Sequence, residues 1–158
     1  MPKLQNGQIF PDLSLEVLDS GRREMVELTQ GRWSLIMFYR ADWCPRCHAY
    51  WDQVAEMKAE IEATGLNLIA ASTDAEPEAR ATRDRHGLWF PIGYGLSLDV
   101  GRGLDIYVNE HRSCLEPAFF LLDEERKIRQ AVISSGAGAR PHIADFLARV
   151  EFLRRQPA

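Results

Sequence analysis

The sequence contains no long hydrophobic run. Across its 158 residues, no apolar stretch approaches the roughly 18 residues that a transmembrane helix needs. The first segment, MPKLQNGQIFPDLSLEV, has one lysine followed by polar residues where a secretory signal would carry its apolar core. These features argue against membrane insertion and predict a cytoplasmic protein.

An excess of charge of one sign is also absent. The 19 Lys and Arg residues and 23 Asp and Glu residues give a net charge of −4, and the basic residues are scattered. The sequence therefore offers no electrostatic basis for binding nucleic acid or an anionic membrane surface. It shows no repeats, and a chain of this length can bury a core without disulfide support. We expect a single domain over residues 1–158.

Cysteine is scarce, and its placement is informative. Only three cysteines occur, and two of them, Cys44 and Cys47, are separated by two residues. In a reducing compartment, that spacing favours redox or metal chemistry over a framework of structural disulfides.

Apolar periodicity predicts alternating strands and helices. Residues 33–39 form a continuous apolar run, as expected for a central strand that is covered on both faces. The remaining pattern predicts a hairpin from 13–18 and 25–28, helices over 45–65, 76–87, 100–108 and 141–153, and strands over 66–71, 90–94, 118–122 and 127–133. We therefore expect an α/β fold with a mixed central sheet flanked by helices. A hairpin extension over about 8–30 would precede a redox core over about 31–153.

The segment Trp43-Cys44-Pro45-Arg46-Cys47 follows the predicted central strand and opens a helix. The first N–H groups of a helix lack partners and carry partial positive charge, so a thiolate there is stabilised and its pKa falls. Pro45 suits the first helical position because it has no N–H to leave unpaired. Arg46 adds a nearby cation, and Trp43 is expected to cover the thiols and contact partners.

These positions suggest separate roles for the two thiols. Cys44 is expected to lie outermost and act as the nucleophile, with Cys47 as the resolving thiol one turn deeper. The alternatives are two small buried side chains, or a zinc site completed by His111 and Cys114. The strand–CPRC–helix context favours redox chemistry, with no metal and no bound organic cofactor. A lone buried thiol is the expected state of Cys114.

Two segments of the chain resemble a known family. Residues 38–47, FYRADWCPRC, resemble thioredoxin-like members of the peroxiredoxin superfamily, which includes alkyl hydroperoxide reductase and thiol-specific antioxidant proteins. Residues 116–123, EPAFFLLD, are similar to a second family segment, and the resemblance extends over about residues 4–153. It implies a thioredoxin-like fold, with Pro117 in the cis form beside the cysteine pair.

The sequence departs from this family at the peroxide pocket. In the alignment, Cys47 falls at the peroxidatic position, Cys44 replaces a threonine and Arg40 replaces a proline. Pro117 stands where the resemblance would place a later arginine. The pocket is thus incomplete on this alignment, with Arg40 or Arg46 as the candidate replacements.

A second departure concerns proton transfer. Phe38 stands where thioredoxin has a buried aspartate that serves the deeper thiol. We hypothesise that Glu116, next to Pro117, is the proton acceptor for Cys47. The alternative is that Glu116 is a partly exposed acid at a strand edge.

The leading interpretation is a thiol–disulfide oxidoreductase. Cys44 would attack a protein or small-molecule disulfide, Cys47 would resolve the mixed disulfide, and a thioredoxin- or glutathione-type reductant would restore the dithiol. One alternative is a peroxiredoxin-like peroxidase that reduces hydrogen peroxide or organic hydroperoxides and forms a Cys44–Cys47 disulfide. Another is a non-catalytic binding module on the same scaffold.

Overall fold

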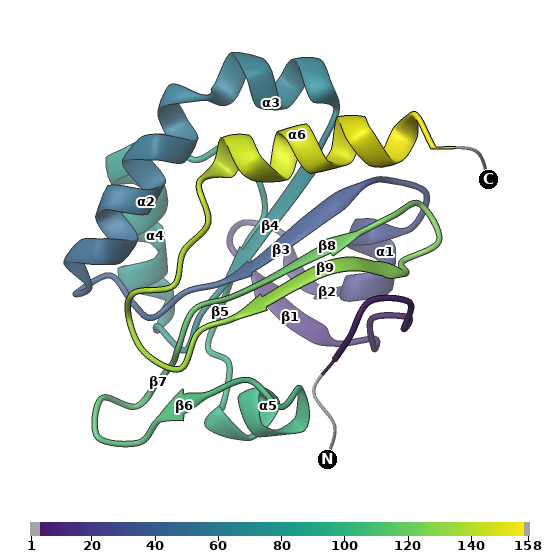
Figure 1. Cartoon of the computed structure of the whole chain (residues 1–158). Helices are drawn as coiled ribbons and strands as arrows, with labels where there is room; N and C mark the ends of the chain where they lie inside the picture. The colour runs from purple at the N-terminus through teal and green to yellow at the C-terminus, as the bar shows by residue number, and fades with distance from the viewer. Residues whose placement is uncertain (1–3, 157–158) are drawn as a thin grey trace.

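A seven-stranded mixed sheet forms the centre of the molecule (Figure 1). The computed structural model describes residues 4–156. The sheet strands are β1 (Ser14–Val17), β2 (Gly21–Glu24), β3 (Ser34–Phe38), β4 (Asn67–Ala71), β5 (Ile92–Tyr94), β8 (Ala118–Leu122) and β9 (Ile128–Ile133). They lie in the order β2-β1-β5-β4-β3-β8-β9, with β3 parallel to β4 and antiparallel to β8. A separate pair joins β6 (Val108–Asn109) to β7 (Cys114–Leu115).

Helices cover both faces of the sheet. They are α1 (Met25–Thr29), α2 (Pro45–Glu56), α3 (Lys58–Thr64), α4 (Glu76–His86), α5 (Leu98–Gly103) and α6 (Ile143–Arg154). Figure 1 shows α6 and α3 along one side of the sheet, with α2 and α4 together at one end. Among residues 4–156, none of the helices combines the length and apolarity needed to cross a lipid bilayer.

The strand β3 explains why residues 33–39 are apolar throughout. All five residues of β3 are buried. Leu35 and Met37 face a core shared with α2 and α6, whereas Ile36 and Phe38 face a second core that contains Phe10. Because side chains alternate across a strand, a central strand between two cores has no position left for a polar face. The predicted central strand is confirmed.

The segment predicted as one helix over 45–65 is two helices. Met57 has φ −98° and ψ 14°, which separates α2 from α3, and Gly65 ends α3 with a positive φ of 77°. Met57 packs against the core and Ile61 is buried, so the bend keeps the apolar stripe in contact with the sheet. The helix stop at Gly65 is confirmed.

The N-terminal hairpin is present, but its second strand is not the predicted one. The strand β2 begins at Gly21, directly after the turn, whereas residues 25–28 belong to α1. A reciprocal pair of hydrogen bonds between Glu24 and Glu27 caps the start of α1. This capping box accounts for the change from strand to helix at Met25.

The predicted cis form of Pro117 is wrong, because no cis peptide bond occurs within residues 4–156. The backbone N–H of Glu116 donates to the Tyr107 carbonyl at 2.9 Å, and the Pro117 carbonyl accepts from Ser134 at 2.9 Å. The chain is extended here, so it makes these hydrogen bonds on both sides of the proline without reversing its direction. The trans isomer, which is intrinsically favoured, therefore fits this position. The predicted single domain also includes residues 1–3 and 157–158, which lie outside the described residues.

Candidate active site

The two paired cysteines lie where β3 passes into α2. Cys44 is the N-cap of α2 and Pro45 is its first residue, as the sequence predicted. The carbonyl of Cys44 accepts hydrogen bonds from the backbone N–H groups of Cys47, at 3.1 Å, and His48, at 3.2 Å. Both thiols are free, and they stand at the end of the helix where backbone N–H groups favour negative charge.

Neither thiol reaches the surface. Cys44 is 0% exposed and Cys47 is 1% exposed, so the prediction that Cys44 faces outward is wrong. Arginine side chains lie against the sulfurs: Arg40 Nη1 is 3.8 Å from the Sγ of Cys44, and Arg140 Nη2 is 3.7 Å from the same atom. Arg140 Nη2 is also 3.1 Å from the Sγ of Cys47. Two guanidiniums thus form part of the cover over the buried sulfurs.

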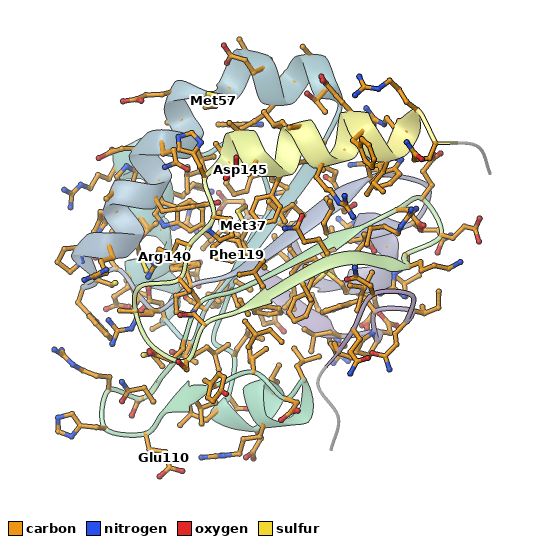
Figure 2. The ribbon with its side chains drawn as sticks, viewed as in Figure 1. Met37, Met57, Glu110, Phe119, Arg140 and Asp145 are labelled. Atoms are coloured by element: carbon orange, nitrogen blue, oxygen red, sulfur yellow. The ribbon has the colours of Figure 1, made fainter. Side chains whose placement is uncertain are left out.

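Sequence reasoning missed Arg140. It lies on the connection between β9 and α6, and Figure 2 shows it beside α2. Its Nε donates to the Ala137 carbonyl at 2.9 Å, which holds the guanidinium toward the thiols. Ninety-three positions separate Arg140 from Cys47, and no motif surrounds it. The fold alone brings it to the site.

Arg40 connects Cys44 to Glu116. The Nε of Arg40 donates to Glu116 Oε1 at 2.9 Å, and both side chains are largely buried, at 14% and 7% exposure. Glu116 is thus a buried, paired carboxylate rather than a free acid at a strand edge. It reaches the thiol pair through Arg40, and its role as the proton acceptor for Cys47 stays a prediction.

The environment separates the pKa values of the two thiols. The hydrogen bond from the Cys47 side chain is the largest influence on Cys44; with the Cys47 backbone N–H, Arg140 and Arg40, it lowers the pKa of Cys44 to about 4. The same contact with Cys44, together with burial, raises the pKa of Cys47. At neutral pH the pair is a thiolate at Cys44 beside a neutral thiol at Cys47. That is the arrangement of a nucleophile next to a proton donor.

Trp43 lies on the surface beside Cys44. Its side chain is 42% exposed, and its ring lies between two guanidiniums, with Arg40 Cζ at 4.9 Å and Arg112 Cζ at 4.7 Å from the ring centroid. Arg46 is exposed on α2, and within residues 4–156 it has no hydrogen bond to either sulfur. Of the two candidate replacements for the family's arginine, Arg40 is therefore at the thiols and Arg46 is not.

A row of hydrogen bonds ties the start of α2 to α4. His48 Nδ1 lies 2.7 Å from His86 Nε2, and His48 Nε2 lies 2.5 Å from the Asp42 carbonyl. At the other end, His86 Nδ1 lies 3.0 Å from Asp52 Oδ1. Local sequence gave no sign of this row because His86 and Asp52 belong to different helices.

The described residues contain no metal-binding cluster. Within residues 4–156, no group of three or more His, Cys, Asp or Glu side chains is arranged to hold a metal ion. His111 is exposed between β6 and β7, and Cys114 is buried on β7. Burial raises the pKa of the Cys114 thiol, which keeps it in the neutral form.

A mixed sheet covered by helices on both faces, with a thiol pair at the start of the helix that follows its central strand, defines a thioredoxin-like thiol protein. The model of the AhpC/TSA family matches residues 6–131, and the chain belongs to that family. The family resemblance predicted from residues 38–47 and 116–123 is therefore confirmed.

Named relatives and solved structures agree with this assignment. Alkyl hydroperoxide reductase C of Staphylococcus epidermidis is 22% identical over 164 residues, which cover 98% of this chain and 86% of the relative. The protein of the same name from Staphylococcus aureus is 23% identical, with the same coverage.

The similar solved structures include AhpC of Mycobacterium tuberculosis, with a TM-score of 0.80 and 18% identity over 98% of this chain and 95% of that one. Peroxiredoxin 6 of Arenicola marina has a TM-score of 0.82 and 15% identity over 96% of this chain and 74% of that one. These structures confirm the thioredoxin-like fold. An oxidoreductase of the peroxiredoxin-like superfamily is confirmed at that general level, and the named relatives favour the peroxidase alternative over disulfide exchange.

Proposed function

We propose that this protein is a thiol peroxidase that reduces hydrogen peroxide or organic hydroperoxides at Cys44 and forms an intramolecular Cys44–Cys47 disulfide. The observation that carries the proposal is the pair of guanidiniums, Arg40 and Arg140, against two adjacent buried thiols. On the sequence alignment, the peroxide pocket lacked its arginine. These two side chains supply the missing positive charge from other positions.

The reaction proceeds in two balanced steps. The Cys44 thiolate attacks one peroxide oxygen, the O–O bond breaks, and the departing oxygen leaves as water or an alcohol after taking up a proton. Cys44 is thereby oxidised to a sulfenic acid. Cys47 then attacks the Cys44 sulfur, water leaves, and the disulfide forms. An external thiol reductant of the thioredoxin or glutathione type returns both thiols to the reduced form.

The guanidiniums serve both the nucleophile and the leaving group. Arg140 and Arg40 stabilise the Cys44 thiolate before the attack. As the O–O bond stretches, negative charge moves to the departing oxygen, and a guanidinium held beside the sulfur stabilises that charge. Since the sulfurs are buried, the site is shielded from water, where such interactions would be weaker.

Electrostatics support Cys44 as the attacking residue, although Cys47 aligns with the peroxidatic position. Cys44 is the thiol with the lowered pKa, and it receives a hydrogen bond from Cys47. The neutral Cys47 thiol is then available to attack the sulfenic acid. The roles follow from the local environment and not from the alignment.

The second candidate function, thiol–disulfide exchange, rests on the same pair of cysteines. Their spacing and contact suit resolution of a mixed disulfide. Burial favours peroxide instead, because a peroxide of a few atoms needs less displacement of Arg40 and Arg140 than a protein disulfide does.

Mixing the fully reduced protein with hydrogen peroxide or cumene hydroperoxide, without any reductant, tests the proposal. We expect the protein to consume one peroxide per chain rapidly and to lose both thiols of the pair. Thiol titration and mass spectrometry measure the loss of the thiols. Insulin and a glutathione mixed disulfide form the comparison arm. Rapid reduction of these disulfides with slow peroxide consumption would replace the proposal with the exchange reaction.

A further inference from the structure

A small pocket lies beside the thiols, between the outer side of α2 and the connection that carries Arg140. Its volume is about 230 Å³, and its lining consists of Arg46, Ala49, Tyr50, Gln53 and Arg140. Arg140 belongs both to this pocket and to the thiol site, because its Nη2 is 3.1 Å from the Sγ of Cys47. Whatever binds in the pocket therefore lies next to the redox pair.

The pocket carries positive charge without a paired acid. Some other arginines pair with acids, as in the contacts of Arg40 with Glu116 and Arg83 with Asp19. Within residues 4–156, no ion pair joins Arg46 or Arg140 to a carboxylate. Asp145, at the start of α6, is exposed and makes no ion pair with either guanidinium in that part of the chain (Figure 2).

Gln53 adds a donor to the lining, whereas Tyr50 adds only its ring. The Tyr50 hydroxyl is fully buried and does not face the pocket. Gln53 uses its oxygen to accept from the backbone N–H of Ile143 at 2.8 Å, which leaves its NH₂ group as a donor. The polar lining thus offers donors and suits a carboxylate.

We propose that this pocket binds a carboxylate of the small thiol that reduces the Cys44–Cys47 disulfide, an inference that rests on the proposed function. In the reduced protein, Arg140 is held by the sulfurs. Once the sulfurs form a disulfide, they carry no negative charge, and the guanidinium is free to bind an incoming anion. The carboxylate therefore binds in the oxidised state. Because the reductant, and not the peroxide, reacts with the oxidised protein, the reductant is the expected occupant of the pocket. The small volume and the buried sulfurs favour a small thiol over a protein thiol.

The pocket also fixes which sulfur is attacked. A thiolate held there lies on the Cys47 side of the disulfide, so its sulfur bonds to Cys47 and the S–S bond breaks. Cys44 leaves as a thiolate, which is favourable because a thiol of lower pKa is the better leaving group. A second thiolate attacks the sulfur of the bound reductant. Cys47 leaves and takes up a proton, and the two reductant molecules depart as one disulfide.

The test measures reduction of the disulfide separately from peroxide chemistry. The protein is oxidised with diamide, freed of the reagent, and mixed with glutathione, which bears carboxylates, or with uncharged 2-mercaptoethanol. The variant is Arg46→Gln, which removes one guanidinium from the pocket. Arg85→Gln is the matched control, because Arg85 is an exposed arginine near Trp43 but outside this pocket.

We expect the rate constant with glutathione to fall about tenfold in Arg46→Gln, the effect of losing one hydrogen bond to a charged group. The rate constant with 2-mercaptoethanol stays unchanged in this variant. In Arg85→Gln, the rate constants with glutathione and with 2-mercaptoethanol both stay unchanged. Equal slowing with both thiols, or no change with glutathione, overturns the proposal. So does reduction by thioredoxin that outpaces glutathione in the unsubstituted protein.

The two proposals fail in distinguishable ways. If reduced protein does not consume peroxide but glutathione discrimination persists, the peroxidase assignment falls and the carboxylate subsite stands. If peroxide is consumed and the rate constants with glutathione and 2-mercaptoethanol change alike in Arg46→Gln, only the carboxylate subsite is contradicted.

Discussion

The two ends of the sheet carry hollows of different kinds. Beside the turn between β8 and β9, a hollow of about 660 Å³ is lined by residues that include Trp33, Asp123 and Arg129. Two of its charges are paired: Asp123 accepts from the backbone N–H groups of Glu125 and Lys127 and pairs with Arg129 at 3.3 Å. At the thiol end the pocket is about 230 Å³, yet its guanidiniums have no paired acid in the described part of the chain. A guanidinium in contact with two thiols, and not volume, therefore marks the reactive end.

The difference follows from the direction of the strands. The carboxyl ends of the parallel strands β3 and β4 and the N-terminus of α2 meet at the thiol end. Backbone N–H groups there favour an anion, and open α/β sheets bind ligands at that edge. The hollow at the opposite end is lined by the turn between β8 and β9, the last residues of α6 and Trp33.

Removing the thiols should produce the largest effect. We expect Cys44→Ser to lower the rate constant for peroxide consumption by roughly 10³-fold or more, because the nucleophile is lost. Cys47→Ser should still consume one peroxide but stop at the sulfenic acid, which dimedone labelling and mass spectrometry detect. Cys114→Ser is the control and should keep the full reaction. A normal rate in Cys44→Ser would assign the attack to Cys47.

The comparison between the two ends can be tested directly with two arginines. Arg140→Met should slow peroxide consumption about 10²-fold, the effect of removing one donor that stabilises developing negative charge. Arg129→Met, at the opposite end, should leave the rate unchanged. Rapid-mixing kinetics on both proteins measure the rate of peroxide consumption. Equal slowing would show that positive charge at the thiol end contributes no more to the reaction than positive charge at the opposite end.

The pH dependence provides a third test. With the pKa of Cys44 lowered from 9.0 to about 4, peroxide consumption should remain constant down to mildly acidic pH and fall as the pH passes through about 4. The unfolded chain binds this proton more tightly, so the stability that ionised Cys44 contributes is complete above pH 9 and is lost as pH falls toward 4. Denaturant unfolding at several pH values should show this slope in the parent protein and a weaker one in Cys44→Ser. Identical slopes would contradict an ionised Cys44.

Breaking the pair of Arg40 and Glu116 should have a smaller effect on the reaction and a clear effect on stability. We expect Glu116→Gln to lower the free energy of unfolding by roughly 3 kcal/mol, because it leaves a largely buried guanidinium without its carboxylate. Formation of the disulfide from the sulfenic acid should slow if Glu116 accepts the proton of Cys47. A double-mutant cycle with Arg40→Gln isolates the coupling between the two residues. An unchanged rate of disulfide formation removes Glu116 from the mechanism.

The smallest effect should come from Trp43. Trp43→Leu removes the ring between Arg40 and Arg112 and should cost about 1 kcal/mol of stability, as measured by denaturant unfolding. Peroxide consumption should change less than in Arg140→Met. A larger loss would place Trp43 in the reaction itself.

Local features of the chain were predictable from the sequence. The burial of β3 is encoded in its apolar run, and Pro45 with Cys44 encodes the start of α2. The start of α1 was also encoded, by Glu24 and Glu27, but the apolar residues after the turn suggested a strand instead.

Features that depend on distant contacts were not predictable. Arg140 and the pairing of His86 with Asp52 join segments that only the fold brings together. The cis form of Pro117 was predicted from a family resemblance. The structure has the trans form, which fits the backbone hydrogen bonds of Glu116 and Pro117.

The row from Asp42 to Asp52 fastens one helix to another through side chains alone. His48 and Asp52 belong to α2, His86 belongs to α4, and His48 also reaches the Asp42 carbonyl in the connection that precedes α2. Burial lowers the pKa of His86, which favours its neutral ring between the two helices. Because α2 begins at the cysteine pair, α4 is the neighbour that keeps the first turn of α2, and with it both sulfurs, in place.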